Sequence, residues 1–509
     1  MVTLDLDQPS HSSSALDALW AANTPEKATA LLENLNGKPS SRYIDSFEPK
    51  TGKLIARVPC ASADEVDAAV SAARAAFPAW SKTPRAERSR LLRRVSEIIA
   101  ENRELFAVWE SLDQGKTLER ARVEVDRAVS NFAYFSTFIL HESTSARMVD
   151  GVALTYEHRS PAGVFVLISP WNMPLYLLTW KIAPCLAFGC TAVAKPSEVT
   201  SMSAFLLASA LGRAGLPAGV INVLFGDGAT TGAALVAHRD VQGVSFTGGT
   251  ATGIAIRRAT AHQIHKHVSL ELGGKNPTLV FADAMTATTR EKTVRTAAMA
   301  AFENQGEICL CGSRIYVERS VYEDFVAGFT EYVTRQYRVG ETVGAVVSLQ
   351  HYAKIRGYLE IAQKQGMTFN TGEVPPEIQT GSGEGGEQQK GYWIQPTVLT
   401  GVPAGSELLR DEIFGPVVTI VPFDDEEEAV RLANDSEYGL AAVLLTTDGG
   451  RMRRVGEQLQ AGLVWVNCWL VRELGTPFGG MKNSGTGREG GEYSRDVFTV
   501  ARTVHLATV

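Results

Sequence analysis

The segment NQGEICLCGSR, residues 304–314, places two cysteines on either side of one leucine. Such thiols could bind a metal, form a disulfide or act as a nucleophile. A metal site would need further groups of ligands, which do not accompany this pair, and a disulfide between residues two apart is strained. A thiolate is a strong nucleophile that can later be displaced from its adduct. We therefore interpret the pair as one reactive thiol, either Cys309 or Cys311, beside a neighbour without an assigned role.

Two further polar residues follow apolar runs and could act on such an adduct. Glu271 in ELGG precedes two glycines, which permit close backbone approach. This glutamate is either a solvated strand end or a general base. Asn172 in SPWNMP is either a helix cap or a donor to an oxyanion. The residue types alone do not decide between the two roles of Glu271 or between the two roles of Asn172.

Two glycine-rich segments are candidates for phosphate binding, although the sequence contains no GxGxxG fingerprint. They are GDGATTG, residues 226–232, and GGTATG, residues 248–253. A glycine-rich turn before a helix can hold a phosphate with its backbone N–H groups. A plain strand-to-helix turn is the more common meaning of either segment.

The motif AKPSE sets Lys195 and Glu198 beyond the end of an apolar run. Open α/β sheets bind ligands there, and a carboxylate at this place accepts hydrogen bonds from ribose hydroxyls and repels a 2′-phosphate. The alternative is a lysine and a glutamate on a surface loop.

Composition excludes several classes of protein. The chain has 509 residues, of which 45% are hydrophobic and 21% charged, as in ordinary globular proteins. Its formal charge of −7 gives no field that favours nucleic acid or an anionic membrane, so we expect neither as a partner. Six cysteines in this length do not make a disulfide framework, which predicts a reducing, cytoplasmic compartment.

Two other features are better explained by ordinary structure than by a membrane span or a metal site. The apolar run 174–194 contains Lys181, Pro184 and Gly189, which favours a buried helix followed by a buried strand over a membrane span. His262, His265 and His267 are not accompanied by an HExxH motif, so we predict no metal site.

The elements that must position these residues alternate between strand and helix. Between about residues 163 and 283 the predicted strands are GVFVLIS, TAVAK, VINVLFG, VQGVSFTGG and KHVSLELGG. A helix in TSMSAFLLASALGRAGLP is expected to begin at a hydroxyl cap and to stop at Gly215. Another helix opens with Ser62 and Glu65 in capping-box spacing. This alternation predicts a parallel, doubly wound sheet.

A second α/β unit follows Cys309. Its predicted elements are RIYVE, the helix SVYEDFVAGFTEYVTRQY, then PVVTIVPF, AAVLLTT and GLVWVN, whereas GSGEGGEQQKG, residues 381–391, is predicted to be an exposed loop. The last run, FTVARTVHLAT, is β-rich and isolated, so we expect it to pair with an edge elsewhere, including one on another subunit.

Taken together, the motifs resemble those of the aldehyde dehydrogenase superfamily. SPWNMP, AKPSE, FTGGTATG, ELGGKNP, NQGEICL, EIFGP and PFGG occur in the order of that family, from about residue 31 to the end. The resemblance implies an α/β aldehyde dehydrogenase-like fold. It comprises a Rossmann-like NAD-binding domain (31–142 and 163–272), an α/β catalytic domain (273–485) and a small β oligomerisation element (143–162 and 486–509), after an N-terminal extension (1–30). It also implies a homodimer or homotetramer.

The resemblance assigns roles to the site residues. Cys309 becomes the nucleophile, Glu271 the base that activates water, and Asn172 an oxyanion donor. The cofactor is NAD. The implied contacts are Lys195 and Glu198 at the adenine ribose, Trp171 and Gly228 along the adenosine, Gly248, Gly249 and Thr250 near the pyrophosphate, Glu412 and Phe414 at the nicotinamide ribose, and in addition Ser169 and Leu272. Two departures affect these contacts: Gly249 stands where many relatives carry a serine, and the segment 339–348 is shorter than the usual loop.

A closer resemblance lies near the C-terminus, in NCWLVRELGTPFGGMKNSGTGREGGEYSRDVFT. It is similar to the branch of the family that oxidises 2-aminomuconate 6-semialdehyde and 2-hydroxymuconate semialdehyde. These aldehydes carry a carboxylate, which the planar fork of arginine binds well. Arg127 and Arg472 match positions that this branch uses, although Val-Asp precedes Arg127 where relatives often have Ile-Pro.

Alternatives to this interpretation remain. Both arginines could be surface residues. The chain could be a general aldehyde dehydrogenase acting on betaine, succinate or aliphatic aldehydes, or an inactive member of the family that serves as a binding or structural protein.

Overall fold

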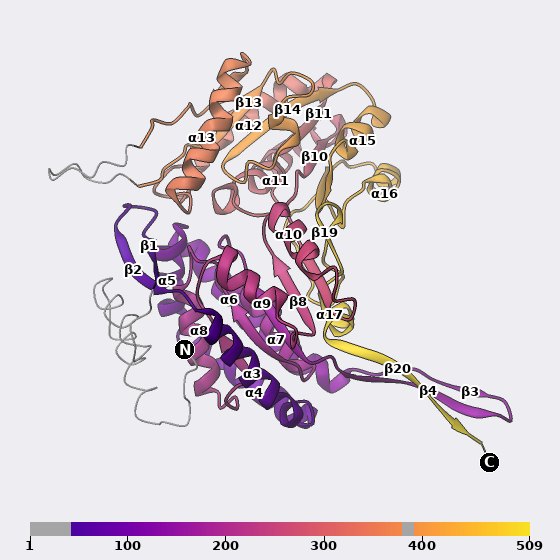
Figure 1. Ribbon diagram of the computed structural model, residues 1–509. Helices are drawn as coiled ribbons and strands as arrows, with labels where there is room; N and C mark the ends of the chain where they lie inside the picture. Colours follow the sequence, from indigo (N-terminus) through magenta and orange to yellow (C-terminus); the bar gives the residue numbers. More distant parts are fainter. Residues whose placement is uncertain (1–41, 379–390, 509) are drawn as a thin grey trace, which may run out of the picture.

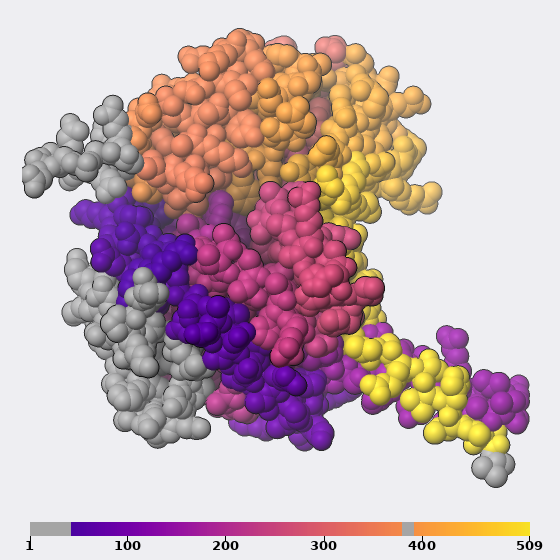
Figure 2. Space-filling model, viewed as in Figure 1, coloured from indigo at the N-terminus to yellow at the C-terminus, as the bar shows by residue number. Residues whose placement is uncertain are grey.

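A computed structural model describes residues 42–378 and 391–508 of the chain (Figure 1). The predicted N-terminal extension, and the predicted exposed loop except for Gly391, lie outside these residues. The described chain forms two α/β bodies and a thin sheet that projects from the lower body, as Figures 1 and 2 show.

The first body contains a six-stranded sheet in the order β19-β9-β8-β5-β6-β7. Its strands are β5 (Val164–Ile168), β6 (Thr191–Lys195), β7 (Ile221–Val223), β8 (Gly243–Thr247), β9 (His267–Glu271) and β19 (Gly485–Thr486). The first five are the five strands predicted, and they run parallel. The chain passes from β5 to β6 and β7 on one side and then returns to β8 and β9 on the other. The strand order therefore reverses between β5 and β8, where open α/β sheets bind ligands.

Helices cover both faces of this sheet because successive residues of its strands point to opposite sides. Val164 and Val166 pack with residues of α3, whereas Phe165 and Leu167 pack with residues of α7. The helices of this body are α3 (Ala63–Trp80), α4 (Arg85–Glu101), α5 (Arg103–Gln114), α6 (Leu118–His141), α7 (Pro174–Ala187), α8 (Met202–Arg213), α9 (Ala233–Ala237) and α10 (Thr250–Thr260). The short pair β1 (Tyr43–Phe47) and β2 (Leu54–Pro59) precedes them. The run 174–194 thus forms a buried helix and a buried strand, as predicted.

One predicted helix cap is correct and one is wrong. At α3 the Ser62 hydroxyl accepts from the Glu65 N–H, and the Glu65 carboxylate accepts from the Ser62 N–H. At α8 the Ser201 hydroxyl makes no cap bond and donates to the Ser197 carbonyl at 3.1 Å. A carboxylate oxygen of Asp113 accepts from the Met202 N–H at 2.9 Å instead. A residue distant in sequence has taken the place of the local cap.

The second body contains a seven-stranded sheet in the order β12-β13-β14-β11-β10-β16-β17. Its strands are β10 (Pro277–Val280), β11 (Arg314–Glu318), β12 (Thr368–Thr371), β13 (Thr397–Thr400), β14 (Val417–Phe423), β16 (Ala441–Leu445) and β17 (Leu463–Val466). All pairs are parallel except that of β12 with β13. Its helices are α11 (Arg290–Phe302), α12 (Tyr322–Gln336), α13 (Leu349–Lys364), α14 (Glu407–Arg410), α15 (Glu426–Asn434) and α16 (Gly449–Gln458). The predicted second α/β unit is therefore confirmed.

The projecting sheet has the order β20-β4-β3 and lies at the lower right of Figure 1. It consists of β3 (Ala146–Val149), β4 (Ala153–Pro161) and β20 (Thr499–Ala507), and α17 (Gly491–Phe498) leads into it. The C-terminal strand thus finds its partner within its own chain, pairing with β4 along its whole length. Met148, Val152 and Leu506 on this sheet are each at least 50% exposed. Among the described residues, we find no helix with the length and apolarity needed to cross a membrane.

Candidate active site

A cavity of about 250 Å³ lies at the switch point between β5 and β8 and is shared by the two bodies. Residues after β5 and β8 line one side, and loops of the second body line the other. The cavity brings together eight predicted site residues: Trp171, Asn172, Gly248, Gly249, Leu272, Cys309, Glu412 and Phe414.

Cys309 lies in the loop between α11 and β11, and the backbone of this loop is tightly held. Asn304 and Gln305, just before it, have φ angles of 53° and 50°. The Asn276 amide donates to the carbonyls of Cys309 at 2.7 Å and Cys311 at 2.9 Å. Both cysteines are free thiols, and Cys309 is the more exposed of the two. Cys309 is thus the thiol that faces the cavity.

The surroundings of Cys309 disfavour its thiolate. Burial raises the pKa of the thiol, and the nearby carboxylates of Glu412 and Glu271 raise it further, while Arg472 opposes them. The thiol of the free protein is therefore protonated at neutral pH. A reaction that uses it as a nucleophile needs a group that takes its proton.

Asn172 is not a helix cap, because the residue before α7 is Met173 and it makes no side-chain cap bond. The Asn172 amide nitrogen donates to the Glu307 carbonyl at 2.8 Å. An amide nitrogen carries two hydrogens, so a second one is left for a further acceptor. The cap alternative is wrong, and the side chain is held in place as a donor beside Cys309.

The backbone of Asn172 is held by a buried lysine that the sequence analysis missed. The Lys116 ammonium donates to the Asn172 carbonyl at 3.1 Å. It also pairs with the carboxylates of Glu124 and Glu110, and all three side chains are buried. Glu110 and Glu124 in turn accept from the N–H groups of Leu175 and Tyr176 in the first turn of α7. The cluster thus ties α5 and α6 to the segment that carries Asn172.

Glu271 ends β9 and is 3% exposed, so the alternative of a solvated strand end is wrong. Among the described residues, neither of its carboxylate oxygens has a hydrogen-bond partner. Burial raises its pKa well above the usual range, and the charge of Glu489 raises it further. A buried, unpaired carboxyl with a raised pKa is suited to proton transfer.

Glu489 belongs to a second polar group that the sequence analysis missed. Its carboxylate accepts from the Lys181 ammonium at 3.1 Å and from the Ser245 hydroxyl at 2.9 Å. Lys181 itself was visible as a charge within an apolar run, which is a signal of a buried partner. The position of that partner, 308 residues away in sequence, was not visible.

Glu412 and Phe414 enter the cavity from the second body. A carboxylate oxygen of Glu412 accepts from the Gly274 N–H at 2.8 Å. A Cβ at Gly273 would lie 2.1 Å from the other oxygen, so a side chain there would displace the Glu412 carboxylate. Phe414 has a φ of 62°, and its carbonyl accepts from the His351 ring at 2.6 Å. The Trp171 ring contacts the rings of both Phe414 and His351. It therefore packs against the loop of the second body that carries Glu412.

The remaining predicted cofactor residues lie along the carboxyl ends of the strands. The Ser169 N–H donates to the Lys195 carbonyl at 3.3 Å, which joins the ends of β5 and β6. The Lys195 ammonium lies 3.6 Å from the Glu198 carboxylate. Gly228 begins a short helix after β7, and Thr250 begins α10 with Gly249 before it. These residues form a row from β7 to the cavity.

Arg127 and Arg472 are not simple surface residues. The Arg472 guanidinium lies over the rings of Trp180 at 4.2 Å and Phe478 at 4.0 Å, and Arg127 lies over Tyr176 at 5.6 Å. Burial lowers the pKa of Arg127, and the charge of Arg472 lowers it further. Within the described part of the chain, neither guanidinium has a carboxylate within 4 Å. Two guanidinium groups without an ion pair therefore lie within reach of each other's charge, and that of Arg472 also acts on Cys309.

A thiol, a buried carboxyl and a held amide at the switch point of a doubly wound sheet define an enzyme of the cofactor-dependent α/β class. The sequence profile of the aldehyde dehydrogenase family matches residues 37–504. The chain belongs to this family.

Individual relatives agree with this result. The chain is 47% identical to a 2-aminomuconic semialdehyde dehydrogenase of Danio rerio, over 93% of this chain and 98% of the relative. It is 42% identical to a 2-hydroxymuconic semialdehyde dehydrogenase of Pseudomonas sp. strain CF600, over 92% and 96%. A crystal structure of HpcC from Thermus thermophilus superimposes with a TM-score of 0.87 at 40% identity, covering 92% of this chain and 91% of the other. An NAD+ complex of an aldehyde dehydrogenase from Bacillus cereus has a TM-score of 0.86 at 35% identity, covering 92% and 94%.

Proposed function

We propose that the protein oxidises a carboxylated semialdehyde, 2-aminomuconate 6-semialdehyde or 2-hydroxymuconate semialdehyde, to the carboxylic acid with NAD. The single observation that carries this substrate class is the pair Arg127 and Arg472, which lie near Cys309 without carboxylate partners. A desolvated substrate carboxylate needs such donors. The names of the relatives from Danio rerio and Pseudomonas agree with this class.

In the proposed reaction, Cys309 gives its proton to a general base, and its sulfur bonds to the aldehyde carbon while the C=O electron pair moves to the oxygen. The Asn172 amide and the Cys309 N–H stabilise the oxyanion, an effect of about 3 kcal/mol per donor in other enzymes. Bound NAD would supply the acceptor for the hydride that leaves this carbon, and the carbon would remain on Cys309 as a thioester. Glu271 then takes a proton from water, which attacks the thioester and releases the acid.

The row of residues from β7 to the cavity fits NAD. Gly249 precedes the first residue of α10 and has open space where a side chain would lie, so a pyrophosphate can approach the first N–H groups of the helix. The Gly248 N–H already donates to the Glu271 carbonyl at 3.0 Å. Lys195 and Glu198 would hold the adenine ribose, and Gly228 and Trp171 would lie along the adenosine, with Trp171 in the cavity lining and Ser169 at the end of β5. Thr250 would lie with Gly248 and Gly249 near the pyrophosphate, and Glu412 and Phe414 would hold the nicotinamide ribose, with Leu272 in the same cavity lining.

Glu198 is expected to select NAD over NADP. Its side chain is 38% exposed beside Lys195, where it would accept from the ribose hydroxyls and repel a 2′-phosphate. We expect kcat/KM with NAD to be about tenfold or more higher than kcat/KM with NADP. The substitution Glu198→Gln should lower this ratio of NAD efficiency to NADP efficiency. The exposed Glu323 provides a control, because Glu323→Gln should leave the ratio unchanged. Comparable efficiency of the wild type with NADP would contradict the assignment.

Arg472→Ala is expected to raise KM for 2-hydroxymuconate semialdehyde by about tenfold or more, because a charge-assisted bidentate contact is lost. KM for a neutral aldehyde such as hexanal should change little. Steady-state NADH formation with both substrates measures the difference, and Arg472→Lys should restore part of it. Equal losses on both substrates would mean that Arg472 is structural. No loss on either would favour a general aldehyde dehydrogenase.

We propose that the projecting sheet joins subunits into a homodimer or homotetramer, and that the domains follow the predicted boundaries. Met148, Val149, Val152, Val500 and Leu506 expose apolar side chains on this sheet. Light scattering should therefore give a mass at least twice that of the chain, and Val500→Glu should lower it. We also propose a reducing, cytoplasmic location, because six cysteines in 509 residues do not make a disulfide framework.

A further inference from the structure

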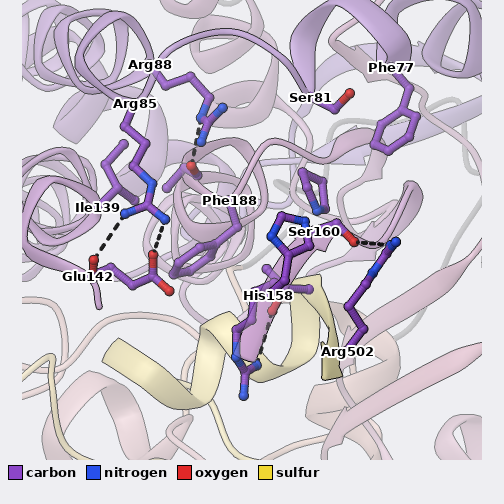
Figure 3. Close-up of a pocket in the computed structure, with 14 residues that line it drawn as sticks. Phe77, Ser81, Arg85, Arg88, Ile139, Glu142, His158, Ser160, Phe188 and Arg502 are labelled. Atoms are coloured by element: carbon purple, nitrogen blue, oxygen red, sulfur yellow. Dashed lines mark hydrogen bonds and ion pairs between the residues drawn. The ribbon is translucent and has the colours of Figure 1, made fainter. Parts of the chain in front are cut away.

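A second cavity, of about 540 Å³, lies at the base of the projecting sheet, far from Cys309. Figure 3 shows it between α4, β4, β20 and the end of α7. It is larger than the cavity at the switch point, and its volume is in the range of small-molecule sites. Neither the proposed reaction nor the family assignment uses it.

The polar lining of this second cavity is mainly cationic. Arg85, Arg88, Arg159 and Arg502 contribute guanidinium groups, and Glu142 is the one acidic residue of the described lining. Glu142 is shared, because its carboxylate lies 2.6 Å from Arg85 and 3.6 Å from Arg495. One carboxylate therefore cannot neutralise the cavity. Arg159 is paired outside the cavity with Glu157 and Asp496.

Arg88 and Arg502 have no ion pair among the described residues. In the described residues, no carboxylate lies within 4 Å of either guanidinium. Arg88 is 8% exposed, and its bonds go to the carbonyls of Ala187 and Thr83, which leaves the second terminal nitrogen without a described partner. Burial lowers the pKa of Arg88 to about 10, so it stays charged at neutral pH. Arg502 donates to the Ser160 hydroxyl at 3.0 Å and is otherwise open to the cavity.

The Arg88 and Arg502 guanidinium groups lie apart in the cavity. Figure 3 shows Arg88, on α4, at the upper left and Arg502, on β20, at the right, with Phe188, His158 and Ser160 between them in this view. The apolar side chains in the lining include Phe77, Ile139 and Phe188. An occupant that satisfies both ends needs acidic groups at two ends and an apolar or aromatic middle.

We propose that this second cavity binds a small organic anion, with acidic groups that reach Arg88 and Arg502. Dicarboxylates with a flat carbon chain and nucleoside monophosphates share this chemistry. Two charge-assisted hydrogen-bonding ends favour such ligands over neutral ones of the same size. The site is independent of the substrate class proposed above.

Isothermal titration calorimetry on the full-length protein tests the proposal, with saturating NAD to occupy the cofactor site. The probes are cis,cis-muconate and AMP, titrated separately into the wild type, Arg502→Ala and Arg502→Lys. The matched control is Arg147→Ala, which removes an exposed arginine on β3 of the same sheet but outside the cavity. Circular dichroism checks that each variant is folded.

We expect at least one probe to bind the wild type, and Arg502→Ala to raise its Kd by about tenfold or more. Arg502→Lys should keep part of the affinity, and Arg147→Ala should match the wild type. Loss of muconate binding alone would assign a dicarboxylate, and loss of AMP binding alone a nucleoside monophosphate. The proposal is overturned if neither probe binds, or if binding is the same in Arg502→Ala and Arg147→Ala, since any binding at the switch point would then account for all of it.

Discussion

Cys309→Ala is expected to lower kcat by about 10⁴-fold or more and to abolish the initial burst of NADH. Without the sulfur, neither the adduct with the aldehyde nor the thioester can form, and the Asn172 donor has no oxyanion to stabilise. The cavity and its cofactor contacts should persist, because the loop is held through backbone carbonyls rather than through the thiol. Stopped-flow absorbance at 340 nm measures the burst, and NAD binding to the variant confirms an intact site.

Cys311→Ala is the matched control, since Cys311 lies two residues away in the same loop. This thiol is 7% exposed and directed toward the Glu303 carbonyl at 3.9 Å, away from the cavity lining. Its replacement should therefore leave the burst in place and change kcat by a small factor. If Cys311→Ala removed the burst and Cys309→Ala did not, the assignment of the nucleophile would be wrong.

Local patterns were sufficient to predict the five parallel strands of the first sheet, although not β19. The alternation of apolar runs and helices gave β5 to β9, and the capping box at Ser62 gave the start of α3. These features depend on residues within a few positions of one another. The motif SPWNMP follows β5, whose carboxyl end lies at the switch point. The motif NQGEICL follows α11 of the second body and reaches the same cavity only in the folded chain.

Contacts between distant parts of the chain could not be predicted in the same way. The cap of α8 is Asp113 rather than Ser201, because a buried carboxylate from α5 reaches the first N–H of the helix. Lys116 and Glu489 escaped notice for the same reason. Each takes its role from partners tens to hundreds of residues away, at Asn172 and Lys181. No local spacing identifies such pairs.

The choice between two roles of a residue also depended on the fold. Asn172 could cap a helix or donate to an oxyanion, and the helix begins one residue too late for the first. Glu271 could be solvated or buried, and β19 covers the edge of β9 at that residue. Burial then sets its protonation. This is the physical quantity that a sequence pattern cannot supply.

Glu271→Gln is expected to lower steady-state kcat by about 10³-fold while the NADH burst remains. The amide is close to the carboxyl in size and leaves the walls of the cavity in place, but it cannot take a proton from water. Acylation and hydride transfer would then proceed once per site, and the thioester would persist. Mass spectrometry of the denatured protein should find the acyl group on Cys309. Glu271→Asp, which keeps a carboxyl on a shorter side chain, should recover part of kcat.

The pH dependence of kcat gives a second and independent readout of Glu271. A general base works in its deprotonated form, so kcat should rise with pH as Glu271 loses its proton. Burial and Glu489 raise the pKa of Glu271, so this rise should lie at a higher pH than the titration of an exposed glutamate. The residual rate of Glu271→Gln should lack the rise. Loss of the burst in a folded Glu271→Gln would instead mean that Glu271 takes the proton of Cys309, whose own pKa is raised, and acts in acylation.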